Sequence, residues 1–379
     1  MPSRYHGQTL WMISLINSIR ILNIFLLLNL CDLCYGGSVG FPMYPYCLIY
    51  PDGKTLGMGA VSLFMSGPIT AYHNPANLDS FLILSISATY ERKTGGFFVG
   101  EGKDVGNYPQ SFGVTIPILK KVSLGFIYQE LMKWRSEYNK DTDKINGALN
   151  LSNVTLGCRL AISEKLNLGF FSGYAWGRST FDGVMNNIKF HDEYNTGGGC
   201  FGFSNLLSLN KSLIFALRFL SATPLRGKRI RQGPIYDTLP IVDNIPWEVN
   251  GGVEYIAKWP LTAVLQITYR NWQRYGGLHS WGNHEFRLHG GFEFHPHRSL
   301  NLRIGTFLEQ FSDNPNVFLS TQKTKIIFFT GGVGIRTEIV DADIGVGRTA
   351  SIAYFPHCEL PFYPNRTIII FSIQFIPRI

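Results

Sequence analysis

From residue 81 onward, the sequence repeats segments of about ten residues in which apolar and polar side chains alternate. In residues 285–295, Phe and Leu share one face of the expected strand, and Glu, Arg and His share the other. Residues 263–270 and 299–309 repeat the pattern. One face suits lipid and the other a wet interior, as in a membrane-spanning β-barrel. A soluble β-sandwich shows the same alternation, so other features must decide between the two.

The connections between these segments alternate in length, which favours a barrel because bacterial barrels have short turns at one end and longer loops at the other. The sequence predicts short turns at 119–121, 163–165, 208–210, 258–260, 296–298 and 338–341. It predicts loops at 92–109, 134–147, 178–194, 222–245, 273–283, 310–324 and 355–365, which are rich in Gly, Asn, Asp and Pro. Counting between these connections predicts about fourteen antiparallel strands, with both chain ends on the periplasmic side.

The composition supports this all-β class. The chain has 40 glycines, 28 phenylalanines and 18 tyrosines, which suits strands joined by many turns. Its net charge of +8 is spread along the chain, except for a cluster of Arg226, Lys228, Arg229 and Arg231. This cluster could bind lipopolysaccharide phosphates at a cell surface, or it could be a solvated loop with no partner. Nucleic acid is not expected as a partner, because no aromatic-basic recognition motif is present.

The first 36 residues are predicted to be a cleaved signal peptide. Residues 21–30 are an apolar run that follows Arg20, and Gly36 and Gly37 offer a cleavage point. A membrane-spanning helix is the alternative, but a span needs roughly 20 apolar residues. Met12 is a second possible start. Together with the alternating segments, this export signal predicts a bacterial outer-membrane protein that also contacts the lipid around it.

Residues 37–80 do not alternate and are rich in Gly, Pro and Ser. A segment of this kind, placed before a barrel, is predicted to be a hatch in the barrel lumen. A periplasmic tail is the other interpretation. The predicted organisation is therefore a signal peptide at 1–36, a hatch at 37–80 and a transmembrane β-barrel at 81–379.

The hatch region contains the marks of a known family. Residues 56–60 (LGMGA) and 72–78 (YHNPANL) resemble the N-terminal signature of the FadL family of long-chain fatty-acid and hydrocarbon transporters. Glycine lets the backbone pack closely in a crowded lumen, and Asn-Pro favours a turn that leads into the first strand. The candidate gating residues are Gly57, Gly59, Asn74, Pro75 and Ala76.

Residues 239–272 and 286–305 are similar to two later hairpins of the same family. The resemblance implies a fourteen-stranded barrel with an N-terminal hatch, which takes apolar ligands from the cell surface and releases them through an opening in the barrel wall. A PorV-like branch shares the barrel but serves type IX protein secretion, and its partners would be secretion-system proteins. The pattern of the two hairpins favours transport, and a purely structural barrel is the remaining alternative.

Nothing in the sequence predicts an enzyme, a cofactor or a metal site. Cys47, Cys158, Cys200 and Cys358 are scattered and lack the spacing of a metal site. No GxSxG motif occurs, and HEFRLH at 284–289 is not the HExxH pattern of a zinc protease. The expected ligand is a hydrophobic small molecule that partitions passively into a lumen pocket.

A fatty-acid ligand would carry a carboxylate, which favours a cation in such a pocket. Arg270, Arg287 and Arg303 are the candidates, because they lie on the lumen faces of three expected strands. Their alternative role is charge balance with Glu285, Glu293 and Glu309. Trp272, Tyr275 and Trp281 lie near an expected strand end and are interpreted as an interfacial aromatic girdle.

Overall fold

The computed structural model describes residues 52–94, 103–140, 143–185, 188–232, 237–257, 260–271, 284–312, 323–352 and 365–377. All of these residues belong to one compact unit, Ser38–Ile379. The signal peptide, the first part of the hatch region and the residues Trp272, Tyr275 and Trp281 lie outside the described residues. In the described part of the chain, no helix has both the length and the hydropathy required to cross a membrane.

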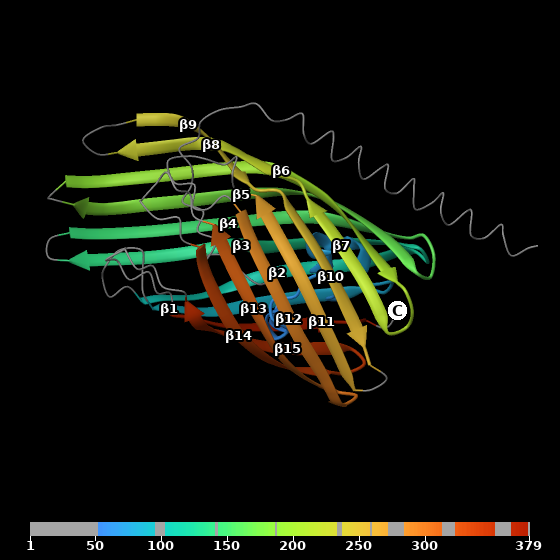
Figure 1. Ribbon diagram of the computed structural model, residues 1–379. Helices are drawn as coiled ribbons and strands as arrows, with labels where there is room; N and C mark the ends of the chain where they lie inside the picture. The colour runs from blue at the N-terminus through green and yellow to red at the C-terminus, as the bar shows by residue number, and fades with distance from the viewer. Residues whose placement is uncertain are drawn as a thin grey trace, which may run out of the picture. The chain divides into compact units, whose positions relative to one another are not determined.

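The structure is a single antiparallel sheet of sixteen strands (Figure 1). The strands are β1 (Ile83–Thr94), β2 (Lys103–Leu119), β3 (Val122–Lys140), β4 (Asp143–Ala161), β5 (Leu166–Met185), β6 (Ile188–Ser208), β7 (Leu213–Leu220), β8 (Thr223–Gln232), β9 (Asp237–Ile245), β10 (Glu248–Ile256), β11 (Leu261–Asn271), β12 (His284–His297), β13 (Leu300–Ser312), β14 (Lys323–Arg336), β15 (Val340–Ile352) and β16 (Asn365–Phe375).

The sheet closes on itself, because β16 pairs with β1. Each strand from β1 to β7 pairs with the next, β7 pairs with β10, and the succession continues from β10 to β16. Strands β8 and β9 form a hairpin outside this circuit: β8 pairs with the first part of β6, and β9 pairs with β8. The predicted all-β antiparallel barrel is confirmed. The sheet has sixteen strands in all: fourteen form the closed circuit, and β8 and β9, which lie within residues 222–245, predicted to be a loop, are outside it.

All six predicted short turns fall between consecutive strands at one end of the barrel, which we call the short-turn end. At the opposite, long-connection end, several predicted loops are wrong. β3 continues to Lys140 and β4 begins at Asp143, so most of 134–147 is strand. Similarly, β5 reaches Met185 and β6 begins at Ile188 within the predicted loop 178–194.

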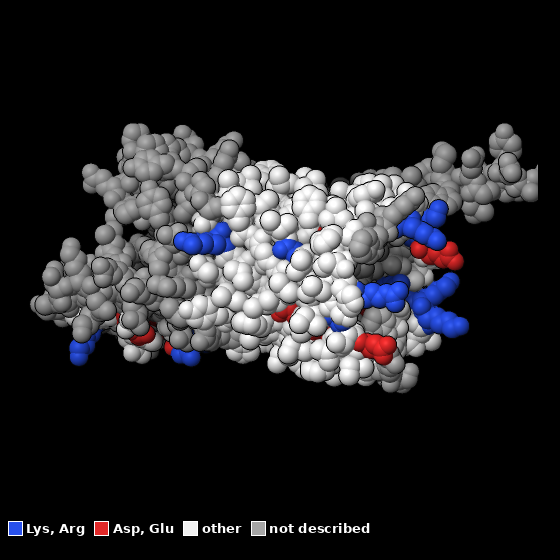
Figure 2. Space-filling view, turned by 90° about the horizontal axis from the view of Figure 1, so that it is seen from below, with Lys and Arg blue, Asp and Glu red and all other residues white. Residues whose placement is uncertain are grey.

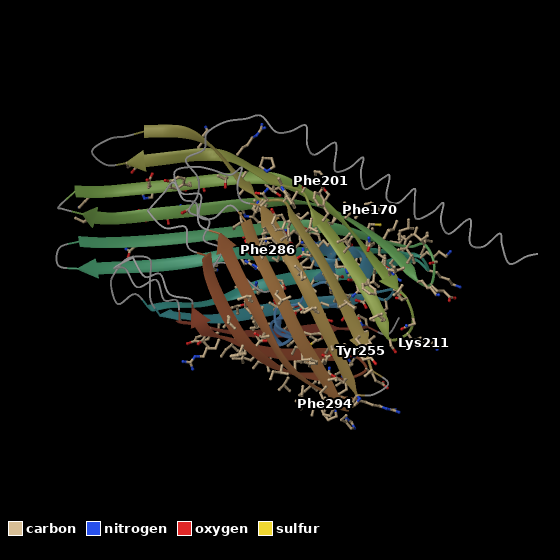
Figure 3. All side chains as sticks on the ribbon, in the orientation of Figure 1. Phe170, Phe201, Lys211, Tyr255, Phe286 and Phe294 are labelled. Atoms are coloured by element: carbon tan, nitrogen blue, oxygen red, sulfur yellow. The ribbon has the colours of Figure 1, made fainter. Side chains whose placement is uncertain are left out.

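The outer face of the barrel carries a belt of exposed apolar side chains. Its members occur on strands all around the ring and include Phe112, Phe126, Leu156, Phe170, Phe201, Phe286, Ile304, Phe329 and Phe371, several of which are labelled in Figure 3. The middle of the surface in Figure 2 is largely uncharged, and charged side chains gather mainly toward one end. Buried strand residues, in contrast, include many Ser, Thr, Gln, Glu and Arg. This arrangement, with apolar side chains outside and polar side chains inside, is the reverse of that in a soluble protein. It excludes the β-sandwich interpretation and fits a barrel surrounded by lipid.

Candidate functional site in the barrel interior and wall

Residues 52–80 form an inner segment that lies within the ring of strands. It contains α2 (Gly53–Gly57), α3 (Thr70–His73) and a 3-10 helix, η2 (Pro75–Asn77). α2 contacts β13 to β16, whereas α3 contacts β3 and β4 and η2 contacts β4 to β6. Because these strands lie on different sides of the ring, the segment crosses the interior.

Glycines on the segment and on the wall allow their backbones to approach closely. Gly59 has φ +74°, and a Cβ on it would lie 2.4 Å from the carbonyl oxygen of Gly290. A Cβ on Gly57 would lie 3.1 Å from the Cα of Gly332, and one on Gly305 would lie 2.2 Å from the nitrogen of Gly59. A larger residue at any of these positions requires the backbone to move. The glycines of the LGMGA motif therefore lie where the inner segment and the wall pack closely.

Wall side chains bond directly to the irregular backbone of the inner segment. The Gln266 side-chain oxygen accepts hydrogen bonds from the amides of Ser62, at 3.0 Å, and Leu63, at 3.1 Å. The hydroxyl oxygen of Thr330 accepts from the Gly59 amide, and that of Ser204 from the Ala76 amide, each at 3.0 Å. Buried backbone donors need such partners where no helix or sheet supplies them. These bonds fix the segment at several points around the ring.

Asn74 holds the inner segment together and does not cap a turn. The residue is fully buried, and its side-chain amide donates to the carbonyl oxygen of Leu63 at 2.6 Å. It is the N-cap of η2, but its side chain makes no capping hydrogen bond there. The bond spans a loop of the segment instead. The following residues, Pro75 and Ala76, pack directly on Gly169, where a Cβ would lie 2.1 Å from the Ala76 nitrogen.

We expect Asn74→Ala to loosen the inner segment and leave the barrel folded. The substitution leaves the buried carbonyl oxygen of Leu63 without its donor, at a cost of about 1–3 kcal/mol. It removes no hydrogen bond between strands. Heat-modifiable gel migration should therefore be retained, while hydrogen exchange of residues 60–76 should become faster. Asn77→Ala is the comparison variant. It removes a similar side-chain hydrogen bond, to the carbonyl oxygen of Met65, at a partly buried site. Loss of barrel assembly in Asn74→Ala would show that the residue is a folding element.

A chain of buried ion pairs lies on the inner faces of β7, β10, β11 and β12. Arg218 pairs with Glu248, and its Nε donates to the carbonyl oxygen of Tyr72 on the inner segment at 3.0 Å. Glu248 also pairs with Arg270, which reaches Glu285 at 3.2 Å. Arg287 pairs with Glu285 in turn. Because Arg218 also bonds to the inner segment, this network of ion pairs connects the barrel wall to the segment.

The structure thus brings Arg270 and Arg287 together but places Arg303 in a separate cluster with Glu293 and, at 2.6 Å, Asp343. All three arginines face inward, and all three are ion-paired. Glu285 and Glu293 are two of the carboxylates expected to balance them; the side chain of Glu309 lies outside the described part. The sequence reasoning missed Arg218 and Glu248, although Arg218 is the one charged residue in the otherwise apolar strand LIFALRFL.

The wall has a break between β2 and β3, which we call the seam. Their pairing begins at the short-turn end and stops at Ser111 and Gln129. Beyond that level, residues 103–109 of β2 pair with β1, and residues 130–140 of β3 pair with β4. Figure 1 shows β3 diverging from β1 and β2 toward the left. The hydrogen-bonded wall is therefore interrupted on the long-connection side of this level.

Two irregularities produce the seam. β3 has a bulge between Glu130 and Met132, so that Leu131 is an extra residue opposite β4. β2 has a register shift at Gln110, beside Pro109, which has no backbone N–H to donate. A bulge bends its strand away from its neighbour, and a proline ends pairing on one side. Both occur where the two strands separate.

Polar side chains line the start of the seam. The Gln110 side-chain amide donates to the Glu130 carbonyl oxygen at 3.5 Å, and the Tyr128 hydroxyl donates to the Glu130 carboxylate at 2.6 Å. On the inner side, a His73 ring nitrogen lies 3.3 Å from the Gln129 side-chain oxygen. Burial, and then the nearby Arg218 cation, lower the pKa of His73 to about 3, so its ring is neutral. The inner segment therefore contacts the wall at the seam itself.

Comparison with known proteins identifies the architecture. No family model and no curated protein matches the sequence. Among solved structures, a Pseudomonas aeruginosa FadL homologue has a TM-score of 0.64 and 11% identity, with 86% of this chain and 97% of that chain covered. The Ralstonia pickettii toluene transporter TbuX has a TM-score of 0.64 and 10% identity, with 90% and 99% covered. The fold is that of a FadL-type barrel.

The Pseudomonas putida toluene transporter TodX gives a similar result, with a TM-score of 0.62, 10% identity, and coverage of 90% of this chain and 99% of that chain. The FadL resemblance seen in the sequence is therefore confirmed at the level of the fold. Within the described parts of this FadL-type barrel, Cys158 and Cys200 are free, and His, Cys, Asp and Glu form no group that could hold a metal ion.

Proposed function

We propose that this FadL-type barrel is an outer-membrane channel for the passive uptake of hydrophobic small molecules. The apolar belt supports a location in lipid, and the likeness to two toluene transporters and a FadL homologue supports hydrophobic cargo. The short-turn end, with both chain ends, would face the periplasm, because bacterial barrels place short turns there. The long-connection end would then face outward.

The observation that carries the proposal is the seam beside the inner segment. The inner segment contacts strands around the ring, which supports the proposal that it blocks a straight path along the barrel axis. At the seam, β2 and β3 do not pair, so a side exit there requires no breaking of backbone hydrogen bonds between strands. An apolar molecule that enters from the long-connection end would leave the interior through the seam and partition into lipid. Gly57, Gly59, Asn74, Pro75 and Ala76 would set the shape of the segment below it.

The ion pairs favour an uncharged ligand. Arg270, Arg287 and Arg303 are already matched by Glu248, Glu285, Glu293 and Asp343. A fatty-acid carboxylate would have to displace a buried carboxylate from one of them, which leaves that charge unpaired. We therefore assign these arginines to charge balance and propose that hydrocarbons are better substrates than fatty acids.

Deleting Leu131 should close the seam and slow uptake. The deletion removes the extra residue of the bulge, while Glu130 and Met132 keep their β4 partners, Ser152 and Leu151. β3 would then run straight and continue to pair along β2. We expect uptake of radiolabelled toluene by cells to fall about tenfold. A tenfold fall corresponds to an increase of about 1.4 kcal/mol in the activation free energy of passage. Oleate uptake, measured in parallel, tests the preference for an uncharged ligand.

Leu131→Ala is the matched control, because it keeps the extra residue and removes only the side chain. Its uptake should stay near that of the parent. If the deletion variant forms a heat-modifiable barrel but takes up toluene normally, the seam is not the exit. If deleting the gene blocks protein secretion and leaves uptake unchanged, the PorV-like alternative replaces the transport proposal.

A further inference from the structure

The outer face of β5 changes its chemistry in a fixed order toward the long-connection end. Phe170 and Tyr174 are each about half exposed, Trp176 follows, and the side chain of Arg178 is 64% exposed. Residues two apart on a strand share a face, so these side chains stand in one column. Apolar, aromatic and cationic groups thus succeed one another along the barrel wall. The same order occurs in a lipid, from acyl chain through polar linkage to charged headgroup.

The β8–β9 hairpin adds two cations beside this column. Asn195 on β6 pairs with Arg178 on one side and with Lys228 on the other. In the next row, Gly197 pairs with Trp176 on one side and with Arg226 on the other. Arg226 and Lys228 are exposed, whereas Leu225, the residue before Arg226, is fully buried. The basic cluster, interpreted from the sequence as a possible loop, therefore stands on a strand next to the aromatic column.

The surface of β6 between the β5 column and the β8 cations is flat. Gly197 has no side chain, and the Tyr174 hydroxyl lies 2.3 Å from where its Cβ would be, so the tyrosine lies across β6. The rings of Tyr174 and Trp176 stack at 6.5 Å with an interplanar angle of 20°. Beside this aromatic platform, a Cβ on Gly199 would meet nothing closer than 3.9 Å. Amphipathic aromatic rings of this kind occupy the headgroup level of a bilayer.

One of these cations, Arg178, is held in position by a carboxylate. Glu193 contacts the Arg178 Nε at 3.0 Å and accepts a hydrogen bond from the Asn195 side chain at 2.7 Å. Arg178, Arg226 and Lys228 outnumber Glu193, and Asp182, farther along β5, pairs with His191, so the surface around these three cations is positive. Phe170 and Phe201 lie below it toward the short-turn end, and both are exposed (Figure 3). A ligand here would meet cations, aromatic rings and apolar side chains in that order.

We propose that this surface of β5, β6 and β8 binds a phosphorylated glycolipid of the outer leaflet. Its phosphate would lie between Arg178, Arg226 and Lys228, its sugar on Tyr174 and Trp176, and its acyl chains along Phe170 and Phe201. Arginine and lysine near a membrane surface attract anionic lipid, and arginine matches phosphate geometry. The site rests on the outward orientation of the long-connection end but is separate from the route of uptake.

The test uses the purified full-length barrel in neutral detergent, with binding followed by native mass spectrometry. The probes are diphosphorylated lipid A, the same lipid without phosphates, and inorganic phosphate. The double variant Arg226→Gln/Lys228→Gln should bind diphosphorylated lipid A about tenfold more weakly, since each cation near the surface contributes measurably. Its binding of the phosphate-free lipid should not change. Lys120→Gln/Lys121→Gln, at exposed positions of the short-turn end, should behave as the parent.

Heat-modifiable migration of both variants shows that they are folded. Added salt should weaken the binding of the parent and have less effect on that of the Arg226/Lys228 variant. Equal loss of binding in the two double variants would overturn the proposal, as would equal binding of lipid A with and without phosphates. Competition by inorganic phosphate at the concentration of the lipid would indicate an anion site only. Toluene uptake, measured separately, is expected to be normal in the Arg226/Lys228 variant, so failure here is distinguishable from failure of the transport proposal.

Discussion

Glu248→Ala is expected to destabilise the folded barrel by about 3–5 kcal/mol, the usual cost of removing one partner from a buried ion pair. Glu248 is 5% exposed and lies between two arginines, Arg218 and Arg270. Alanine leaves both guanidinium groups without this carboxylate in a region of low dielectric. Arg218 also bonds to Tyr72, so the defect should reach the inner segment. Few single substitutions reach this size.

The measurement is urea unfolding of the barrel in lipid vesicles, followed by tryptophan fluorescence and gel migration. Glu248→Gln keeps an oxygen acceptor of the same shape and should lose less stability. Glu254→Ala is the control on the same strand and inner face, because the ion pairs with Arg218 and Arg270 involve Glu248 and not Glu254. A Glu248→Ala barrel as stable as the Glu254→Ala barrel would show that the arginines are solvated by water and do not depend on this carboxylate.

The part of the fold that lies in lipid could be predicted from the sequence. There the outer face must be apolar and the inner face is polar, as on β12, where Phe286 and Leu288 are exposed and Glu285 and Arg287 are buried. The strand extensions beyond the belt could not be predicted in this way. Residues 134–140 of β3 (WRSEYNK) are mainly polar and show no regular alternation, so their sequence predicted a loop. Polar strands of this kind have the composition of loops.

The candidate site was predictable in part. The glycines at 57 and 59 indicated close packing in the interior, which the inner segment shows. The partner of Asn74 was not predictable, because its bond to Leu63 depends on how an irregular segment folds back on itself. The seam depends on a single extra residue, Leu131, and a one-residue bulge leaves no clear mark in one sequence. Pro109 within a strand was the available signal.

Gly291→Ala is expected to displace the inner segment and make the barrel permeable. A Cβ at Gly291 would lie 2.4 Å from the carbonyl oxygen of Met58 and 2.8 Å from its carbonyl carbon. These are backbone atoms, which cannot rotate aside, so the segment itself must shift. The wall should survive, because the strand hydrogen bonds of β12 with β11 and β13 are unaffected. A barrel that is blocked in the parent should then conduct small hydrophilic solutes.

Gly290→Ala is a closely matched control, because it adds the same methyl group to the neighbouring residue of the same strand. Its Cβ would meet nothing closer than 4.0 Å. We expect ion conductance in planar bilayers, and cellular sensitivity to a large hydrophilic antibiotic, to rise for Gly291→Ala and to stay at the parent level for Gly290→Ala. Lys54 is the sole tryptic site among residues 52–80, so cleavage after it, identified by mass spectrometry, reports exposure of the segment directly. Lys54 should become cleavable in Gly291→Ala alone. If Lys54 stays protected and conductance stays low in a folded Gly291→Ala barrel, the segment has adapted within the lumen and does not act as a displaceable hatch.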